Sequence, residues 1–543
     1  MRIRKRSMLL LVLAGLGAML LAALPNASQA APVRPAQSAG AGPGNWPSWQ
    51  GDLSGSRFAA STPISPGNVG ELAAKWAFAF PPIAGTFPSS QPAVVGNTLY
   101  VGSNDAKFYA LNATSGATLW SYDLTGVVGS VATNPDPVRD GPAVSGGTVY
   151  FGDTRGYLYA VNARTGALRW ARLLDTVNPD VEETGSPTVY GGLVYIGVSN
   201  RENNYQAQNL GYPCCTARGE VVAVNAATGA VVWRHYTVPP AQPAGTWPSG
   251  ATMYAPSGVS VMTTPVIDRA AGLLFVGTGN NYTGATGEAD SVLALNVRTG
   301  GVVWSYQAQP DTYITLCDNP QYAPTYCPQE AAGTAHDWDM ASGNLFQVGG
   351  RTVLGMGEKS GVYRAFDALT GKLLWSQSLA ADPNVPGGDA GIVWGGSYDG
   401  HYLYVATWFG NPGTLYALNP ATGAIVWQTP SPADGCSTGG AAGQPGCALA
   451  FTPAVTTAPG LVFEGNADGK LYAFSSATGQ LLWQYDTVRQ FQGVNGAPGF
   501  GESISGIGGA VVANGMVYVE SGYYPLFASP EGTVLLAFAL PGS

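Results

Sequence analysis

The sequence predicts an all-β fold, an eight-bladed β-propeller, and three observations lead to it. One phrase returns seven times along the 543 residues, and each copy carries a tryptophan four residues after a turn glycine. The composition, with 75 Gly, 40 Pro and only 10% charged residues, favours short strands and tight turns over surface helices. Self-similarity at a period of this length is typical of repeat architectures such as propellers.

The repeated phrase has the pattern of a β-hairpin. Its copies are YALNATSGATLW, YAVNARTGALRW, VAVNAATGAVVW, LALNVRTGGVVW, RAFDALTGKLLW, YALNPATGAIVW and YAFSSATGQLLW. An apolar strand leads into Asn, Asp or Ser, whose side chain can cap the turn, and glycine supplies the positive φ that such turns need. The capping positions are Asn112, Asn162, Asn225, Asn296, Asp367, Asn419 and Ser475.

The tryptophan of each phrase is expected to lie between neighbouring blades, because alternation along the strand points it at a packed face. The turn glycines are Gly116, Gly166, Gly229, Gly300, Gly371, Gly423 and Gly479. The tryptophans are Trp120, Trp170, Trp233, Trp304, Trp375, Trp427 and Trp483. A further strand pair precedes each phrase, as in GNTLYVGSNDAKFYAL, so each unit predicts a four-stranded antiparallel blade.

The eighth blade must combine both ends of the chain. Near the C-terminus, GGAVVANGMVYVESGY and GTVLLAFAL supply three strands without a terminal tryptophan. Near the N-terminus, ELAAKWAFAF supplies one strand that contains Trp76. Pairing this N-terminal strand beside GTVLLAFAL closes the ring and leaves no exposed sheet edge. The propeller is therefore predicted to cover residues 46–543.

The first residues have the features of a secretory signal. Basic residues cluster within 2–6, an apolar run covers 8–24, and small residues at 28–30 fit a cleavage site. We expect a signal peptide over residues 1–30 and a disordered linker over 31–45; a retained N-terminal anchor is the alternative. No later apolar run is long enough to span a bilayer, so we expect a secreted, periplasmic or cell-envelope protein.

Charge and cysteine content narrow the partners and the compartment. A net charge of -9 disfavours nucleic acid or an anionic membrane as a partner, and nothing in the composition indicates an oligomer, so we expect a monomer. Six cysteines fit an oxidising compartment. Cys317 and Cys327 can close one loop and Cys436 and Cys447 another, whereas adjacent Cys214–Cys215 form either a vicinal disulfide or two free thiols. No C-x-x-C-H motif for covalent haem occurs.

Beyond the propeller, the sequence resembles the alcohol dehydrogenases that use pyrroloquinoline quinone (PQQ), and most of all their polyvinyl alcohol dehydrogenase branch. The stretch CCTARG before VVAVNAATG, from Cys214 to Gly229, is similar to that branch. Four segments match the family's site: YIGVSNRE, FVGTGN, HDWDMA and EKSGVYRAFD. The resemblance implies a catalytic base at Asp339, calcium ligands at Glu202, Asn280 and Asp339, and a cation at Lys359 that contacts the quinone oxygens.

The same resemblance implies further cofactor contacts. Thr184 in TGSP and Ser199 in VSN match positions that bind the cofactor carboxylates, and Met262 stands where the family stacks a tryptophan on the quinone. The other candidates for the pocket lining or its cover are Arg139, Gln91, Cys214 and Cys215. Ala341 replaces the second aspartate of lanthanide-using relatives, which favours calcium.

The chemistry of such a site explains these residue types. Calcium prefers hard oxygen ligands and polarises a quinone carbonyl as a Lewis acid. Asp339 is expected to take the alcohol proton as hydride passes to the quinone, and Lys359 to stabilise charge on the reduced oxygen. Each residue also has an ordinary reading: Glu202 as a solvated loop residue, Asn280 as a turn residue, Asp339 as a cap and Lys359 as a hairpin residue.

The sequence therefore predicts an exported PQQ- and calcium-dependent dehydrogenase of secondary or polymeric alcohols. It is expected to pass electrons to a separate acceptor, such as a soluble cytochrome c. The alternatives are a non-catalytic propeller that acts as a cell-envelope binding or assembly scaffold, and a quinoprotein that oxidises sugars. Long connections are where a site is expected on a rigid scaffold. They cover residues 201–219, 236–258, 308–336 and 429–450.

Overall fold

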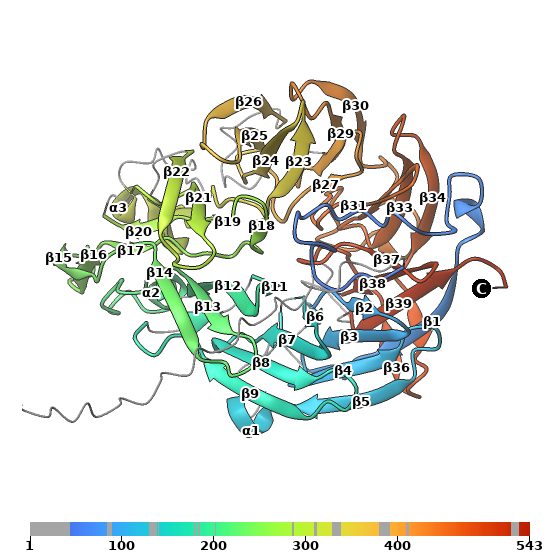
Figure 1. Ribbon diagram of the computed structural model, residues 1–543, viewed down its shortest axis with the longest axis horizontal. Coiled ribbons are helices and arrows are strands. Elements are labelled where there is room, and N and C mark those ends of the chain that lie inside the picture. The colour runs from blue at the N-terminus through green and yellow to red at the C-terminus, as the bar shows by residue number, and fades with distance from the viewer. Residues whose placement is uncertain are drawn as a thin grey trace, which may run out of the picture. The chain divides into compact units, whose positions relative to one another are not determined.

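Each predicted repeat folds into an antiparallel sheet, and the sheets follow one another around a ring (Figure 1). In this computed structural model the described residues are 44–83, 90–129, 138–139, 141–178, 181–182, 185–200, 202–284, 287–308, 312–327, 338–379, 391–408, 412–522 and 532–542. Seven sheets have four strands, and the sheet of the third blade adds a short fifth strand, β10 (Val181–Glu182). The eight-bladed β-propeller is confirmed.

In blades 1 to 4 the strands follow chain order from the innermost strand outwards. Blade 1 contains β2 (Ala93–Val95), β3 (Thr98–Gly102), β4 (Lys107–Asn112) and β5 (Thr118–Asp123). Blade 2 contains β6 (Ala143–Ser145), β7 (Thr148–Gly152), β8 (Tyr157–Asn162) and β9 (Leu168–Leu173). Blade 3 contains β11 (Thr188–Tyr190), β12 (Leu193–Asn200), β13 (Glu220–Asn225) and β14 (Val231–Tyr236). Blade 4 contains β18 (Val266–Asp268), β19 (Leu273–Gly277), β21 (Ser291–Asn296) and β22 (Val302–Gln307).

Blades 5 to 8 have the same order, and the last blade takes its outer strand from the N-terminal part. Blade 5 contains β23 (Asn344–Val348), β24 (Arg351–Gly357), β25 (Val362–Asp367) and β26 (Leu373–Ser378). Blade 6 contains β27 (Ser397–Tyr398), β28 (Leu403–Ala406), β29 (Thr414–Leu418) and β30 (Ile425–Pro430). Blade 7 contains β31 (Thr456–Ala458), β32 (Leu461–Gly465), β33 (Lys470–Ser475) and β34 (Leu481–Asp486). Blade 8 contains β37 (Val511–Ala513), β38 (Met516–Ser521), β39 (Val534–Ala539) and β1 (Ala73–Ala79).

Short elements between the blades complete the described structure. Three two-stranded sheets pair β15 (Gln242–Thr246) with β16 (Thr252–Ala255), β17 (Ser257–Gly258) with β20 (Asn281–Thr283), and β35 (Gln490–Gln492) with β36 (Pro498–Phe500). The α-helices are α1 (Thr125–Val128), α2 (Glu202–Gln208) and α3 (Ala323–Tyr326). The 3₁₀ helices are Val69–Glu71, Thr315–Asp318 and Gly439–Ala441. Among the described residues no helix is long and apolar enough to cross a membrane.

The N-terminal strand closes the ring as predicted. Strand β1 pairs antiparallel with β39, and Trp76 lies opposite Ala537 next to a bulge. The indole N–H of Trp76 donates to the carbonyl oxygen of Ala113 in blade 1 at 3.1 Å. Strand β1 therefore joins the last blade to the first, and the eighth blade obtains its tryptophan from the other end of the chain.

Each repeat tryptophan docks onto the blade that follows it. Trp120, for example, donates its indole N–H to the Ala163 carbonyl oxygen at 3.0 Å and covers the turn of blade 2. A Cβ on Gly166 in that turn would lie 2.6 Å from the Trp120 ring, and its φ of +71° also favours glycine. Glycine is thus needed at this position for two reasons: the turn has a positive φ, and the tryptophan side chain of the preceding blade leaves no room for a Cβ.

The turn caps match the prediction with one exception. Six of the seven capping side chains accept hydrogen bonds from backbone N–H groups two or three residues ahead, as Asn162 does from Arg164 and Thr165. Ser475 caps no turn with its side chain among the described residues, and the backbone bond from Gly479 N–H to its carbonyl closes that turn. A serine hydroxyl is one atom shorter than an Asn or Asp side chain.

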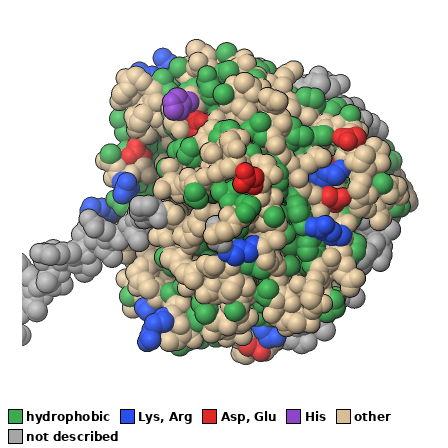
Figure 2. Space-filling model, turned by 90° about the vertical axis from the view of Figure 1, so that its right-hand side faces the viewer, with side chains coloured by type: hydrophobic (Ala, Val, Ile, Leu, Met, Phe, Trp, Pro, Cys, Tyr) green, Lys and Arg blue, Asp and Glu red, His purple; other side chains and the backbone are tan. Residues whose placement is uncertain are grey.

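The antiparallel order gives the ring two different ends. The end we call the turn end carries the short turns between first and second strands and the Thr-Gly turns. The other, which we call the loop end, carries the connections between second and third strands and between blades. Figure 2 shows charged side chains scattered singly over one side of the molecule, in keeping with the low charge content.

A segment from Gly44 to Ala59 runs along the innermost strands of most blades at the turn end. Its backbone hydrogen-bonds with Asn514, Val94, Val144, Ile267, Leu345, Tyr398 and Thr457, which belong to blades 8, 1, 2, 4, 5, 6 and 7. Within it, the buried Arg57 guanidinium donates to the carbonyl oxygens of Trp49 and Val455 and lies 4.6 Å from the Trp49 ring centroid. The segment therefore fills the middle of the ring and ties the blades together.

Candidate active site

Three residues of the predicted site meet at the loop end, where blade 4 adjoins blade 5. The Nζ of Lys359 lies 2.7 Å from Oδ2 of Asp339, and both side chains are largely buried. The other carboxylate oxygen, Oδ1, accepts from the backbone N–H of Asn280 at 3.1 Å and from its Nδ2 at 3.3 Å. The Asp339 carboxylate therefore has one oxygen facing a cation and one held by an amide.

The backbone around Asp339 explains why its side chain is so well held. The N–H of Lys359 donates to the Asp339 carbonyl oxygen at 3.1 Å, and the N–H of Trp338 donates to Oδ1 of Asn280 at 3.2 Å. Gly279 leaves room for the carboxylate, because a Cβ at that position would collide with Oδ1 of Asp339. The loops after β19 and β24 and the connection before β23 thus fix the carboxylate together.

Glu202 begins helix α2, directly after β12, and its side chain is buried rather than solvated. Its carboxylate accepts from the backbone N–H groups of Thr216 at 2.7 Å and Ala217 at 2.6 Å, and from the hydroxyls of Thr216 and Tyr212. Burial raises the pKa of Glu202, and these neutral donors oppose that shift. A buried carboxylate whose donors among the described residues are all neutral is well suited to receive a cation.

A short chain of hydrogen bonds connects Glu202 with the group of Asp339, Asn280 and Lys359, which we call the Asp339 cluster. Oδ1 of Asn200 accepts from Glu202 N–H at 3.2 Å, and its Nδ2 donates to Ser260 Oγ at 3.4 Å. The Ser260 carbonyl oxygen accepts from Gly279 N–H at 2.8 Å, next to Asn280. The predicted calcium ligands of blades 3, 4 and 5 are thus linked at one end of the ring.

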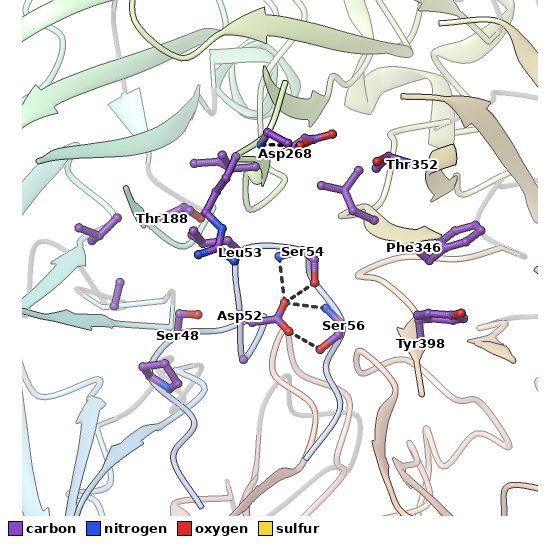
Figure 3. Close-up of a pocket in the computed structure, with 18 of the residues that line it drawn as sticks. Ser48, Asp52, Leu53, Ser54, Ser56, Thr188, Asp268, Phe346, Thr352 and Tyr398 are labelled. Atoms are coloured by element: carbon purple, nitrogen blue, oxygen red, sulfur yellow. Dashed lines mark hydrogen bonds between the residues drawn. The ribbon is translucent and has the colours of Figure 1, made fainter. Parts of the chain in front are cut away.

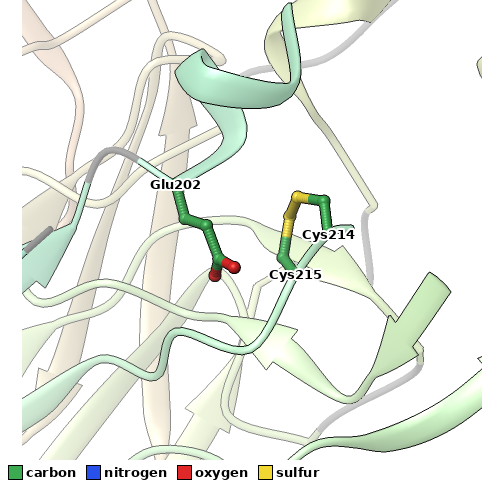
Figure 4. Close-up of side chains that lie close together, drawn as sticks. All are labelled: Glu202, Cys214 and Cys215. Atoms are coloured by element: carbon green, nitrogen blue, oxygen red, sulfur yellow. A yellow bond between two sulfur atoms is a disulfide. The ribbon is translucent and has the colours of Figure 1, made fainter. Parts of the chain in front are cut away.

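The adjacent cysteines form a disulfide beside Glu202. The sulfur atoms of Cys214 and Cys215 and a carboxylate oxygen of Glu202 all lie within 4.8 Å of one another (Figure 4). The oxidised sulfurs are not available as thiolate metal ligands, so this cluster is a wall of the site and not a metal centre of its own. Of the two forms left open by the sequence, the structure has the vicinal disulfide.

The long loops place aromatic side chains over this disulfide, among them Trp247, Tyr282 and Tyr326, and we call this group the aromatic lobe. The indole N–H of Trp247 donates to the Cys214 carbonyl oxygen at 2.6 Å, and the Trp247 ring stacks on Tyr326 with centroids 5.7 Å apart. Tyr326 precedes Cys327, which is disulfide-bonded to Cys317 as expected. These loop insertions therefore build one buried cluster around the disulfide of Cys214 and Cys215. The second expected loop closure, Cys436–Cys447, is also present.

Two more predicted residues lie on the elements that form the site. Ser199 is buried near the end of β12, next to Asn200. Met262 is half-buried, and the segment around it hydrogen-bonds with β12 through Val261 N–H and with blade 4 through the Thr263 hydroxyl. These positions are compatible with cofactor contacts, which stay predictions.

The other predicted pocket residues are less informative. The side-chain amide of Gln91 donates to the Trp49 carbonyl oxygen at 2.8 Å and accepts from Arg57 at 2.9 Å. It therefore supports the segment from Gly44 to Ala59, which we call the central segment. Arg139 is half-buried beside Val138. Thr184 lies outside the described residues. The cofactor roles of these three residues stay predictions.

Sequence reasoning missed the residues that hold the ligands in place. Asn200, Thr216, Ser260 and the lobe residue Tyr282, whose hydroxyl donates to the Asn200 carbonyl oxygen at 3.4 Å, were not singled out. A weak signal existed for Thr216, since it follows the two cysteines directly. The others are common polar residues whose roles depend on contacts between blades.

The residues present fit calcium and PQQ. Glu202, Asn280 and Asp339 offer carboxylate and amide oxygens, the hard ligands that calcium prefers. The Lys359 ammonium, a cation with three donors, lies beside Asp339, where a cation suits the oxygens of a quinone. Glu202 adds a buried negative charge with neutral donors only, which a divalent cation would offset.

Comparisons with known proteins show which families the chain is similar to. Residues 46–311 match the PQQ family, described as the β-propeller domain of glucose, ethanol and alcohol dehydrogenases, and residues 358–513 match a family described as outer membrane protein assembly factor BamB. The chain is 33% identical over 523 residues to polyvinylalcohol dehydrogenase of a Pseudomonas species, covering 92% of this chain and 78% of that protein. It is 30% identical to the polyvinylalcohol dehydrogenase of Sphingopyxis sp. strain 113P3, covering 92% and 76%.

Solved structures show the same fold. The quinohemoprotein alcohol dehydrogenase of Comamonas testosteroni superposes with a TM-score of 0.67 at 19% identity, covering 93% of this chain and 82% of that one. This likeness concerns the fold, whereas the two polyvinylalcohol dehydrogenases establish the relationship in sequence. The chain belongs to the family of PQQ-dependent alcohol dehydrogenases with an eight-bladed β-propeller, together with the polyvinyl alcohol dehydrogenases.

Proposed function

We propose that this protein oxidises secondary or polymeric alcohols with PQQ as the electron acceptor and calcium as the metal. The observation that carries the proposal is the convergence of Asp339, Lys359 and Asn280 at the loop end, with Asp339 Oδ2 2.7 Å from the Lys359 ammonium. Family membership supports PQQ-dependent alcohol oxidation. The polymeric substrate is supported by the two related polyvinylalcohol dehydrogenases.

The side chains have separate tasks in this reaction. Asp339 accepts the hydroxyl proton of the alcohol at its carboxylate, a general-base contribution of about 10²–10⁴ in rate. Asn280 fixes the direction of that carboxylate through two donors on Oδ1, which leaves Oδ2 as the oxygen near Lys359. The Lys359 ammonium balances the Asp339 charge, and its positive charge stabilises a reduced oxygen.

Glu202, Asn280 and Asp339 are the residues that would hold calcium, and Lys359, Ser199 and Arg139 offer donors to an acidic quinone. When bound there, PQQ would supply a two-electron acceptor and calcium would supply Lewis-acid polarisation of that acceptor. The disulfide of Cys214 and Cys215, with the lobe above it, limits access of water to the Glu202 side of the site. Excluding water strengthens the electrostatic interactions inside such a site.

Electrons are proposed to leave to a separate acceptor, such as a soluble cytochrome c. Export through the signal at residues 1–30 is proposed as well, and that segment lies outside the described residues. The disulfides Cys317–Cys327 and Cys436–Cys447 support an oxidising compartment.

A second candidate is a propeller that binds proteins at the cell envelope without catalysis. The match of residues 358–513 to the BamB family favours it, as does Met262 in place of a stacking tryptophan. A scaffold has no need for the buried Glu202 or for the Asp339–Lys359 pair. The dehydrogenase therefore has the stronger support.

The test is a titration of purified protein with PQQ in the presence and absence of calcium, followed by dye-linked oxidation of an alcohol and sugar panel. We expect stoichiometric, calcium-dependent binding and turnover of secondary alcohols such as pentane-2,4-diol. Absence of PQQ binding under both conditions would favour the scaffold. Turnover of sugars but of no other alcohol would change the proposed substrate class and leave the proposed quinone chemistry unaffected.

A further inference from the structure

A cavity at the turn end lies away from the Asp339 cluster. It has a volume of about 600 Å³, within the range of about 300–1,000 Å³ typical of small-molecule sites. Its floor is the central segment, which hydrogen-bonds through Leu53 and Ser54 to Ile267 and Leu345. Its walls come from the inner strands of blades 2 to 6, so five blades share it.

The lining combines hydroxyl groups with apolar surface. The hydroxyl side chains are Ser48, Ser54, Ser56, Ser145, Thr188, Thr352 and Tyr398. Between them lie aliphatic side chains, and on one wall the Phe346 and Tyr398 rings have centroids 5.3 Å apart (Figure 3). Within the described part of the chain, the hydroxyls of Ser48, Ser145 and Tyr398 make no hydrogen bond, so they are available to a ligand.

The two carboxylates in the cavity already accept hydrogen bonds, and the Arg269 side chain is exposed to solvent. The Asp52 carboxylate accepts from the N–H and hydroxyl groups of both Ser54 and Ser56, as the dashed lines in Figure 3 show. Asp268 accepts from the backbone N–H groups of Ala270 and Ala271. Arg269 is the single cationic side chain in the described lining. This lining suits a neutral ligand with hydroxyl groups better than an ion.

We propose that this turn-end cavity binds a stretch of polymeric alcohol, a neutral carbon chain with hydroxyls on alternate carbons. The combination of hydroxyl and apolar side chains in the lining suits a chain that carries both CHOH and CH₂ groups. The inference rests on the proposed function, since a second stretch of the same polymer would reach Asp339 at the loop end. Anchoring one stretch raises the effective concentration of the others at the site, as in other bivalent binding.

The experiment measures binding in cofactor-free protein, by equilibrium dialysis with short oligomers of vinyl alcohol. Ser145→Trp places a large ring in the cavity, and Tyr398→Phe removes one hydroxyl while keeping the ring. Ser121→Trp is the matched control, because Ser121 is exposed on the outer strand β5. We expect Ser145→Trp to weaken oligomer binding about tenfold, equivalent to ~1.4 kcal/mol, Tyr398→Phe about threefold, and the control to have no effect.

Steady-state kinetics of the loaded enzyme give a second measurement. The KM for the polymer should rise about tenfold in Ser145→Trp, an expectation from the same binding loss, while the KM for pentane-2,4-diol stays unchanged. Equal oligomer binding by Ser145→Trp and Ser121→Trp would overturn the inference. Tighter binding of a neutral oligosaccharide than of the vinyl alcohol oligomer would also overturn it. Because binding is measured without PQQ, a protein that binds oligomer but oxidises no alcohol would refute only the proposed function.

Discussion

The Lys359 ammonium lies 2.7 Å from Oδ2 of Asp339, and the two residues come from different connections at the loop end of blade 5. Neither residue is needed to form a strand or a turn of the propeller. Asn280 from blade 4 occupies the other carboxylate oxygen, so the pair depends on the packing of two blades. This arrangement leads directly to the first prediction.

Asp339→Asn should lower kcat for secondary alcohols by about 10²–10⁴, because the amide cannot accept the hydroxyl proton. The variant keeps the shape of the side chain, so PQQ affinity should fall much less than turnover. Dye-linked kinetics together with a PQQ titration check both expectations. Asp367→Asn is the control, since that carboxylate caps a Thr-Gly turn at the opposite end of the ring. Undiminished oxidation by Asp339→Asn would show that another group takes the proton.

Glu202→Gln should weaken calcium binding by at least about tenfold, because the site loses its buried negative charge. The glutamine oxygen can still accept from Ala217 N–H, so the loop itself should stay folded. Isothermal titration of the cofactor-free protein with calcium measures the change. Glu288→Gln, which removes a partly exposed carboxylate paired with His235, should leave the affinity unaltered. Calcium affinity equal to wild type in Glu202→Gln would remove Glu202 from the ligand set.

Much of the architecture follows from local rules that repeat along the chain. The turn glycine, the capping side chain and the tryptophan are each set by neighbours a few residues away, so seven copies predict seven blades. Trp76 completes the eighth because an N-terminal strand with the same pattern must close the ring. These features are predictable because periodicity and turn chemistry act within each repeat.

The parts of the structure that could not be predicted depend on contacts between residues that lie far apart in the sequence. The central segment around Arg57 has no alternation and no repeat, and its structure comes from hydrogen bonds to many blades. Glu202 was expected to have a loop position, but its burial follows from Thr216 and Ala217, which lie beyond helix α2. Its role in the site was suggested by family resemblance, and its surroundings required the structure.

Gly300→Ala should destabilise the protein by about 1–3 kcal/mol, since the added Cβ meets the Trp233 ring and the φ of +69° disfavours a side chain. Trp233→Phe should cost a similar amount, through the lost donor to the Val297 carbonyl oxygen at 3.0 Å and the smaller ring. Denaturant unfolding measures both. Gly301→Ala is the neighbouring control, because Gly301 is exposed and its added Cβ would come no closer than 3.4 Å to Thr299 Oγ1. Equal stability of the two alanine variants would contradict the docking role.

The last prediction concerns pH and two buried aspartates, which lie in the loops that follow the second strands of blades 2 and 7. Burial raises the pKa of Asp153 and of Asp468 to about 6, although each accepts hydrogen bonds, including one from a tyrosine hydroxyl. The native state therefore binds protons more tightly than the unfolded state between pH 4 and pH 6. The unfolding free energy should fall as pH rises through this window, and the loss stays in place above it.

Asp153→Asn removes this ionisation, so its stability relative to wild type should improve from pH 4 to pH 7, by on the order of 2–3 kcal/mol. Asp123→Asn should show the opposite slope. Hydrogen bonds from Thr125 lower the pKa of Asp123, so the wild-type carboxylate stabilises the protein above the unfolded pKa and loses this effect on acidification. Urea unfolding of the three proteins at each pH separates the two signs. A flat difference for Asp153→Asn across this range would mean that burial does not hold a proton on Asp153.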